Sequence, residues 1–223
     1  IEAAKAYLFA NSEFPDSSWD TKIARDIFWE QSMHGILQEN AGVNLKDFKN
    51  EDEFFTYLSR SAIFTAKRGA QNYYFYPIPA IDYLSYKKIE AYNLSGEIVE
   101  ITPKQVDFEN HRSYQYQDLT TRGTVEFRSV CAQPFDRTFI STAFHLGILA
   151  NLDNVQKYLQ EADFFKKEGR NYKQLRQKFS KKEISGSAET HVRNFANDLI
   201  QLAIAGLVVR NNGEESYLKD LMV

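Results

Sequence analysis

The sequence of 223 residues is poor in the side chains that build disulfide frameworks and metal clusters. It contains one cysteine, Cys131, and four histidines. A single cysteine excludes an internal disulfide and a cysteine-based metal cluster, and it fits a reducing compartment such as the cytoplasm. The histidines show no metal-ligand spacing such as HExxH. A lone thiol of this kind is usually inert packing, although Cys131 follows a polar strand and could be considered as a nucleophile.

Long apolar runs are also missing. No run approaches about 18 apolar residues, so the sequence supports no membrane span. No signal peptide is visible. Neither a P-loop nor a GxGxxG segment occurs, so these glycine-rich cradles cannot supply a nucleotide site.

The charge is close to balanced, with 27 basic and 30 acidic residues and a net charge of −3. This balance argues against a general nucleic-acid or membrane-surface role. The stretch 166–182 is locally basic and carries two aromatic residues, which could suit a polyanion. A solvated helical face is the more ordinary interpretation of such a stretch.

What the chain has in quantity is hydrophobic and aromatic side chains. The hydrophobic content is 43% and the aromatic content 14%, with 13 tyrosines and 17 phenylalanines. The length allows one large domain or two small ones with a sizeable core. So many aromatic residues indicate a large aromatic core or a lined cleft.

The hydrophobic pattern predicts a mixture of helices and short strands. Segment 19–31 is ambiguous, because its apolar spacing is helical while the resemblance described below favours an extended segment around Arg25. Asn50 is the expected cap of a helix with an acidic first turn. Expected helices are 2–10, 50–58, 136–151, 154–161 and 188–210, and expected strands are 62–67, 72–76 and 98–101.

The most informative stretch is RGTVEFR at 122–128, which alternates like a β-strand. Thr124, Glu126 and Arg128 lie on one face, and Val125 and Phe127 on the other face, which could pack on a core. A carboxylate suits Mg²⁺, and a guanidinium suits phosphate or another carboxylate. Chemistry on a magnesium nucleotide needs both groups. The ordinary alternative is an ion pair on a solvated sheet face.

Three segments together resemble the glutamate–cysteine ligase family. RGTVEFRSVCAQP at 122–134, followed by the apolar run STAFHLGIL, is similar to the family's arginine-rich strand, proline loop and buried helix. YLFANS at 7–12 and ARDIFW at 24–29 are similar to two of its upstream motifs. A weaker similarity is the late helix 192–207, which ends in AIAGL. The segments lie in family order and span nearly the whole chain.

The resemblance implies an α+β fold of the glutamine-synthetase type, in which part of an antiparallel sheet is surrounded by helices. Residues 1–223 would form a single domain or the C-terminal portion of a larger catalytic domain. The sheet-bearing part would be roughly 1–134, and the helical part roughly 135–223.

The implied activity is ATP-dependent ligation of glutamate to cysteine through an acyl phosphate, with ATP and Mg²⁺, in the cytoplasm. Arg128 and Arg25 would hold the transferring phosphoryl group or glutamate, and Glu126 would bind the metal. The resemblance further assigns substrate or ATP contacts to four residues: Arg122, Asn11, Ser12 and His111.

The sequence also departs from the family pattern. Glu13 stands where the family has proline, Cys131 where it often has aspartate, and no early GxExE strand supplies further metal-binding glutamates. The opening at Ile1 reads as the middle of a helix, so we expect the C-terminal portion of a longer enzyme. Its partner would be the missing N-terminal segment or a second copy of the chain. A ligase for another amine, and a non-catalytic fragment or binding module, remain open alternatives.

Overall fold

The structure is a computed structural model that describes residues 1–10, 18–111, 114–119 and 124–221, apart from the side chains of residues 38 and 117–119. It mixes helices with antiparallel sheet, as expected for an α+β protein. The chain divides into two compact units: unit 1 contains residues 1–24 and 129–223, and unit 2 contains residues 25–128. The N-terminal residues therefore group with the C-terminal helices, which the expected division near residue 134 did not anticipate.

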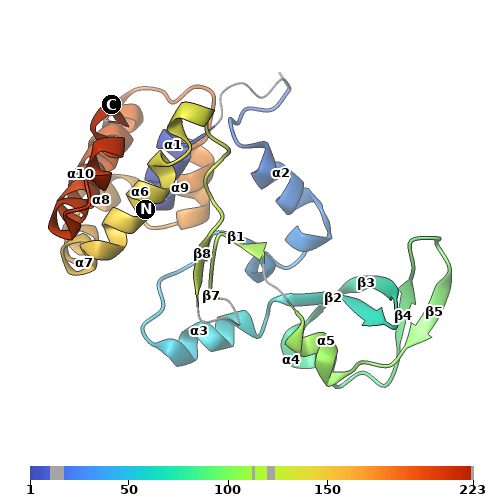
Figure 1. The fold of residues 1–223 in the computed structure, drawn as a ribbon. Helices are drawn as coiled ribbons and strands as arrows, with labels where there is room; N and C mark the ends of the chain where they lie inside the picture. Colours follow the sequence, from blue (N-terminus) through green and yellow to red (C-terminus); the bar gives the residue numbers. More distant parts are fainter. Residues whose placement is uncertain (11–17, 112–113, 120–123, 222–223) are drawn as a thin grey trace. The chain divides into compact units, whose positions relative to one another are not determined.

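Unit 1 is helical (Figure 1). The expected helices at its N-terminus, between residues 136 and 161 and at 188–210 are confirmed, with small shifts at their ends. Its helices are α1 (Glu2–Leu8), η3 (Phe135–Arg137), α6 (Ile140–Ala150), α7 (Leu152–Glu161), α8 (Asp163–Glu168), α9 (Tyr172–Phe179), α10 (Ser187–Arg210) and η4 (Glu214–Leu221).

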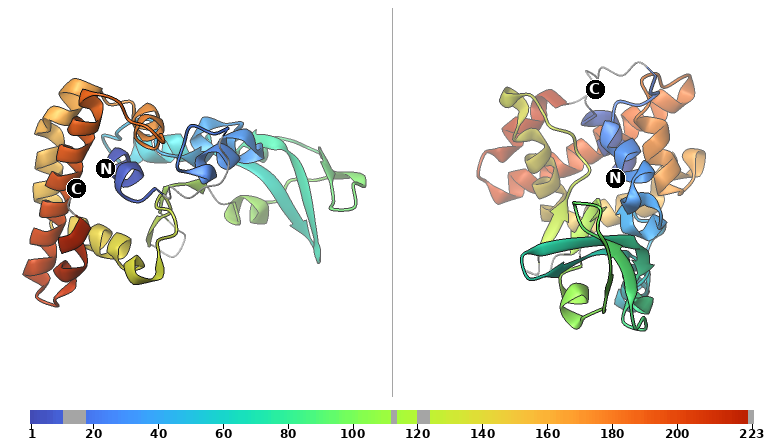
Figure 2. Two further views of the ribbon diagram at one scale, coloured as in Figure 1. Left: turned by 90° about the horizontal axis from the view of Figure 1, so that it is seen from above. Right: turned by 90° about the vertical axis from the view of Figure 1, so that its right-hand side faces the viewer.

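The central helix of unit 1 is α10, which runs the length of the unit (Figure 2) and packs closely against α6. Two glycines make the close approach possible. A Cβ atom at Gly206 would lie 2.2 Å from the carbonyl oxygen of Gly147, and one at Gly147 would lie 2.3 Å from the carbonyl oxygen of Ala203. The helix ends at Asn211, which adopts the left-handed conformation typical of a helix C-terminus.

The apolar core of unit 1 explains much of the aromatic content. Phe164 and Phe195 stack with their ring centroids 4.2 Å apart, and Phe9 meets Phe144 edge to face at 5.6 Å. These rings are at most 5% exposed. Burial of each such ring contributes on the order of 2–3 kcal/mol, so this core is sufficient to hold the helices together.

Of the described helices, α10 alone is long and apolar enough to cross a membrane by length and composition. Its most apolar window is 44% buried inside unit 1, and residues such as Val192, Leu199 and Leu207 are fully buried against other helices. A core helix of a soluble protein has these properties, and we interpret α10 as such a helix.

A group of charged side chains lies inside unit 1. The carboxylate of Glu2 accepts a hydrogen bond from Nη1 of Arg176 at 3.0 Å. It also forms an ion pair with Lys5 at 2.5 Å. Nη2 of Arg176 donates to the carbonyl oxygen of Ser129 at 2.9 Å. Burial by itself would raise the pKa of Glu2, but the neighbouring charges of Lys5 and Arg176 outweigh it and lower that pKa to about 2. This buried group ties α1 to α9.

Unit 2 contains the sheets and several short helices. The described strands form a four-stranded antiparallel sheet in the order β2-β3-β4-β5 and two pairs, β1-β6 and β7-β8. The elements are α2 (Ala24–Gln31), η1 (Met33–Gly35), η2 (Gln38–Asn40), β1 (Ala41–Gly42), α3 (Glu51–Leu58), β2 (Ala62–Arg68), β3 (Gln71–Pro79), α4 (Ala80–Tyr83), β4 (Ile89–Tyr92), β5 (Ile98–Ile101), α5 (Gln105–Glu109), β6 (Tyr114–Gln115), β7 (Gln117–Leu119) and β8 (Val125–Phe127).

The expected strands at 62–67, 72–76 and 98–101 are confirmed. The expected helix after Asn50 is also confirmed, and the Asn50 side chain caps it by accepting a hydrogen bond from the backbone N–H of Glu53 at 2.9 Å. One face of the four-stranded sheet packs into a core that includes Phe75, Tyr83 and Ile101. Phe75 and Ile101 come from strands β3 and β5, in which alternate side chains point to one face, and Tyr83 comes from α4.

One local expectation was wrong. The segment around Arg25 is not extended but forms the first turn of α2, so its helical spacing was the better guide. In the strand expected at 122–128, Val125 is 54% exposed and Phe127 is partly buried, so its apolar face packs only in part. A short strand at the end of a sheet with one neighbour leaves part of its apolar face in water.

Candidate anion-binding site

Arg128 lies at the end of β8 and is held on several sides. Its Nε and Nη2 donate to the same oxygen of Glu126, at 3.0 and 2.5 Å, and its Nη1 donates to the carbonyl oxygen of Gln115 at 3.1 Å. Its backbone N–H donates to the carbonyl oxygen of Tyr116 at 2.8 Å. The guanidinium is therefore fixed in direction while its side chain remains 33% exposed.

Arg25 reaches the same place from α2. Its Nη1 donates to the carbonyl oxygen of Arg128. The next residue, Asp26, accepts a hydrogen bond from the hydroxyl of Tyr116. Together these two bonds attach the first turn of α2 to the chain around β6 and β8. The guanidinium of Arg25 is thus anchored on the backbone of Arg128, while the guanidinium of Arg128 is paired with Glu126. Guanidinium groups of this kind suit phosphate or carboxylate.

Glu126 is the carboxylate of this region and is 34% exposed. Its backbone partner across the β7-β8 ladder is Asp118. The ladder therefore brings the backbones of two acidic residues side by side. The sequence analysis did not use Asp118, although its distance from Glu126 fits a hairpin.

The donor chemistry of Glu126 fits Mg²⁺, which proteins usually bind through one or two carboxylates together with substrate phosphates. Within the described residues, no group of three or more histidine, cysteine or acidic side chains could hold a metal ion. A metal here would consequently need ligands beyond the described side chains, such as phosphate oxygens and water.

Aromatic side chains border the arginines. The ring of Tyr114 lies 4.9 Å from that of Trp29 and 4.1 Å from that of His34, measured between centroids. Burial raises the pKa of the Tyr114 hydroxyl, and the nearby charge of Arg128 opposes this rise. Burial lowers the pKa of His34. These ring contacts make Trp29 a packing residue of this region.

Tyr114 and Tyr116 were missed as site neighbours. The alternation of YQYQ at 114–117 was the available signal, because it is typical of an extended segment that presents every second side chain to one face.

The other predicted contacts are not brought together in what the structure describes. Nε2 of His111 is hydrogen-bonded to Oγ of Ser61 at 2.9 Å. Asn11, Ser12 and Arg122 lie outside the described residues.

The basic stretch 166–182 in unit 1 is largely engaged by acidic partners. Lys178 pairs with Glu168 at 2.6 Å, and Arg176 belongs to the buried group with Glu2. Further pairs join Lys166 to Asp163 and Lys181 to Asp20, at 2.8 and 2.9 Å. These pairs offset much of the charge that a polyanion would need.

A scan against protein-family models and a search of curated proteins gave no match to this chain.

Proposed function

We propose that the chain takes part in the ATP-dependent ligation of glutamate to cysteine. The observation that supports the proposal is the bond from the Arg25 guanidinium to the backbone carbonyl of Arg128, because it joins segments 103 residues apart. That the two guanidinium groups meet one anion is part of the proposal. The resemblance of 122–134, 24–29 and 7–12 to glutamate–cysteine ligases supplies the reaction. A cytoplasmic location fits the single cysteine.

In the proposed reaction, an oxygen of the glutamate side-chain carboxylate attacks the γ-phosphorus of ATP, and ADP leaves. The cysteine amine then attacks the acyl carbon, the C–O bond to phosphate breaks, and inorganic phosphate leaves as the amide forms. Arg25 and Arg128 would stabilise the charge on the transferring phosphoryl group, which is the main requirement of such catalysis.

Glu126 would hold Mg²⁺, which supplies charge neutralisation of the phosphates when it is bound. The bond between Glu126 and Arg128 fits this role, since it keeps both side chains in one orientation before an anion arrives. Tyr116 and Gln115 would act only as positioning residues, through their backbone contacts to Arg128.

Two alternatives are compatible with the same geometry: a ligase for another amine, and a binding module that holds an anion without chemistry. The lack of a three-residue metal group in the described part of the chain is the observation that favours the binding module.

The test is formation of γ-glutamylcysteine, followed by mass spectrometry, with glutamate, cysteine, ATP and Mg²⁺. It should be run on the 223-residue chain and on the product of the complete gene. Cysteine-dependent ADP release supports the proposal. Equal ADP release with other amines favours the first alternative, and nucleotide binding without any product in both preparations favours the second.

A further inference from the structure

A polar cavity lies in unit 1, and its interpretation does not depend on the ligase proposal. It has a volume of about 420 Å³ and lies between α7, α8 and α10. Small-molecule pockets usually have volumes of about 300–1,000 Å³. The side chains around it come from three helices that the core of unit 1 holds together.

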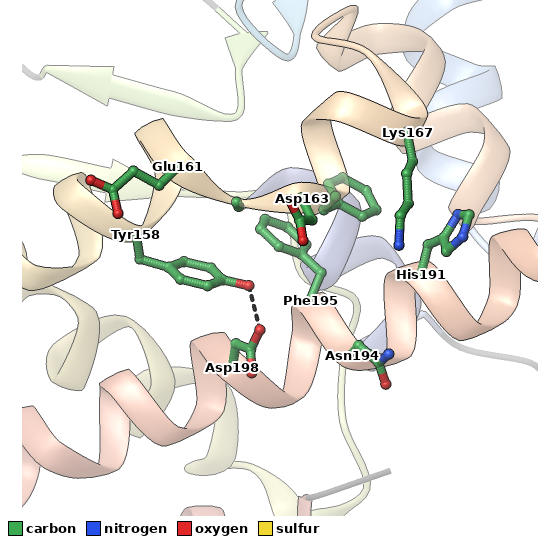
Figure 3. A pocket seen from close by; sticks show the side chains of 10 residues that line it. Tyr158, Glu161, Asp163, Lys167, His191, Asn194, Phe195 and Asp198 are labelled. Carbon is green, nitrogen blue, oxygen red and sulfur yellow. Dashed lines mark hydrogen bonds between the residues drawn. The ribbon is translucent and has the colours of Figure 1, made fainter.

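The charged groups of this cavity are separated by sign (Figure 3). Lys167 and His191 lie at one end, and Glu161 and Asp198 lie toward the other. Between them lie Asp163 and the ring of Phe195. The cavity therefore has a cationic end and an anionic end.

At the cationic end, Lys167 has no hydrogen-bond or ion-pair partner within the described part of the chain. His191 is held by a bond of 2.6 Å between its Nδ1 and Glu168. That carboxylate lies outside the cavity lining and fixes the Nδ1 side of the ring. The ring is thus oriented. The ammonium of Lys167 interacts electrostatically with Asp163 of the same lining but makes no bond to it that would exclude a ligand anion.

At the anionic end, Glu161 has no hydrogen-bond or ion-pair partner among the residues that the structure describes. Asp198 accepts a hydrogen bond from the hydroxyl of Tyr158 at 2.7 Å, and this bond orients the Asp198 carboxylate. Tyr158 in turn stacks on Phe195, with the ring centroids 6.0 Å apart. The packed rings make this end rigid, which reduces the entropy that a ligand must overcome on binding.

We propose that this cavity binds a zwitterion of the amino-acid or short-peptide class. Its ammonium would meet Asp198 and Glu161, and its carboxylate would meet Lys167 and His191. A purely cationic ligand would be repelled at the Lys167 end, and a purely anionic ligand at the Asp198 end. Only a ligand with both charges uses both ends.

The experiment titrates the full chain at pH 7 with glycine, glycylglycine and triglycine, by isothermal titration calorimetry. These probes differ only in the separation of their charges, and none is a substrate of the proposed ligase. At least one should bind saturably with a dissociation constant of about 1 mM or lower. Two derivatives of the probe that binds should bind at least about tenfold more weakly than the probe itself. They are the C-terminal amide, which lacks the carboxylate, and the N-acetyl form, which lacks the ammonium.

Lys167→Gln and Asp198→Asn should each weaken binding of that probe about tenfold or more, because each removes one charge that the ligand meets. Lys157→Gln and Asp153→Asn are the matched controls, since they make the same charge changes on exposed positions of α7 outside the cavity lining. The controls should leave binding unchanged.

The proposal is overturned if none of the three probes binds with a dissociation constant of about 1 mM or lower. It is also overturned if the amide binds as well as the parent zwitterion, which would indicate a cation site, or if the controls weaken binding as much as the cavity variants. Because none of these probes is glutamate, cysteine or ATP, failure here would leave the ligase proposal untouched.

Discussion

The Nη1 of Arg25 donates a hydrogen bond to the carbonyl oxygen of Arg128. Arg25 lies in the first turn of a helix, and Arg128 lies at the end of a strand. Because the acceptor is a backbone oxygen, the bond is lost when the Arg25 side chain is replaced but not when that of Arg128 is replaced.

Replacing either arginine by lysine should lower the rate of γ-glutamylcysteine formation by about 100-fold, because lysine lacks the planar fork that holds a phosphoryl group through two parallel bonds. The measurement is kcat and KM of Arg25→Lys and Arg128→Lys in the complete gene product. Arg60→Lys, at an exposed side chain of the same unit, is the control and should keep its rate. An unchanged kcat in both site variants would remove these arginines from the reaction.

Glu126→Gln should raise the Mg²⁺ concentration needed for half-maximal activity, because the amide keeps the shape of the side chain but loses the charge that a metal requires. The fold should survive, since the pair with Arg128 is one-third exposed and such pairs contribute less than about 1 kcal/mol. Magnesium titrations of ADP release, combined with thermal melts, measure both effects. Glu90→Gln, at an exposed position of β4, is the control. An identical magnesium titration in Glu126→Gln and the control would exclude Glu126 as a ligand.

Stability should depend on acid pH through Glu2, whose pKa is lowered from 4.5 to about 2 in the folded chain. The unfolded chain binds the proton more readily, so the contribution of Glu2 is complete above about pH 4.5 and is lost as the pH falls through about 2. A shift of this size corresponds to roughly 3 kcal/mol. Urea unfolding between pH 2 and 7 measures this dependence.

Glu2→Gln should flatten this acid dependence and lower stability at pH 7 by about 3–5 kcal/mol, because the positive charges of Lys5 and Arg176 would remain buried without their carboxylate. Glu189→Gln, at an exposed position of α10, should leave the acid profile almost as it is. An unaltered profile in Glu2→Gln would show that other carboxylates cause the acid loss.

Gly206→Ala should destabilise unit 1 by about 1–3 kcal/mol or more, since its methyl group would collide with the backbone of Gly147 and force α6 and α10 apart. Calorimetric melting temperature is the measurement. Val209→Ala lies on the same helix at a position that is 84% exposed, and it should change stability by less than about 0.5 kcal/mol. Equal melting temperatures for Gly206→Ala and the parent chain would contradict the close packing.

The local pattern determined many of the longer elements of this protein. Asn50 predicted a helix cap, and the apolar periodicity of 188–210 predicted the central helix, because capping and amphipathic periodicity depend on neighbours a few residues away. The ambiguity at Arg25 was decided by packing, since its helix is held in place by contacts to segments about a hundred residues later. A strand of three residues such as β8 is too short for its alternation to establish which face is buried.

The sequence by itself determined which side chains could meet an anion or a metal: it placed a carboxylate and a guanidinium two residues apart on one strand. Only the tertiary structure decided that Arg25 lies against Arg128, that Asp118 faces Glu126 across a ladder, and that Arg176, in a stretch that looked solvated, is buried against Glu2. The physical reason is that charge pairing acts through space. A basic residue has the same appearance in the sequence whether its partner is water, a ligand or a carboxylate from the other end of the chain.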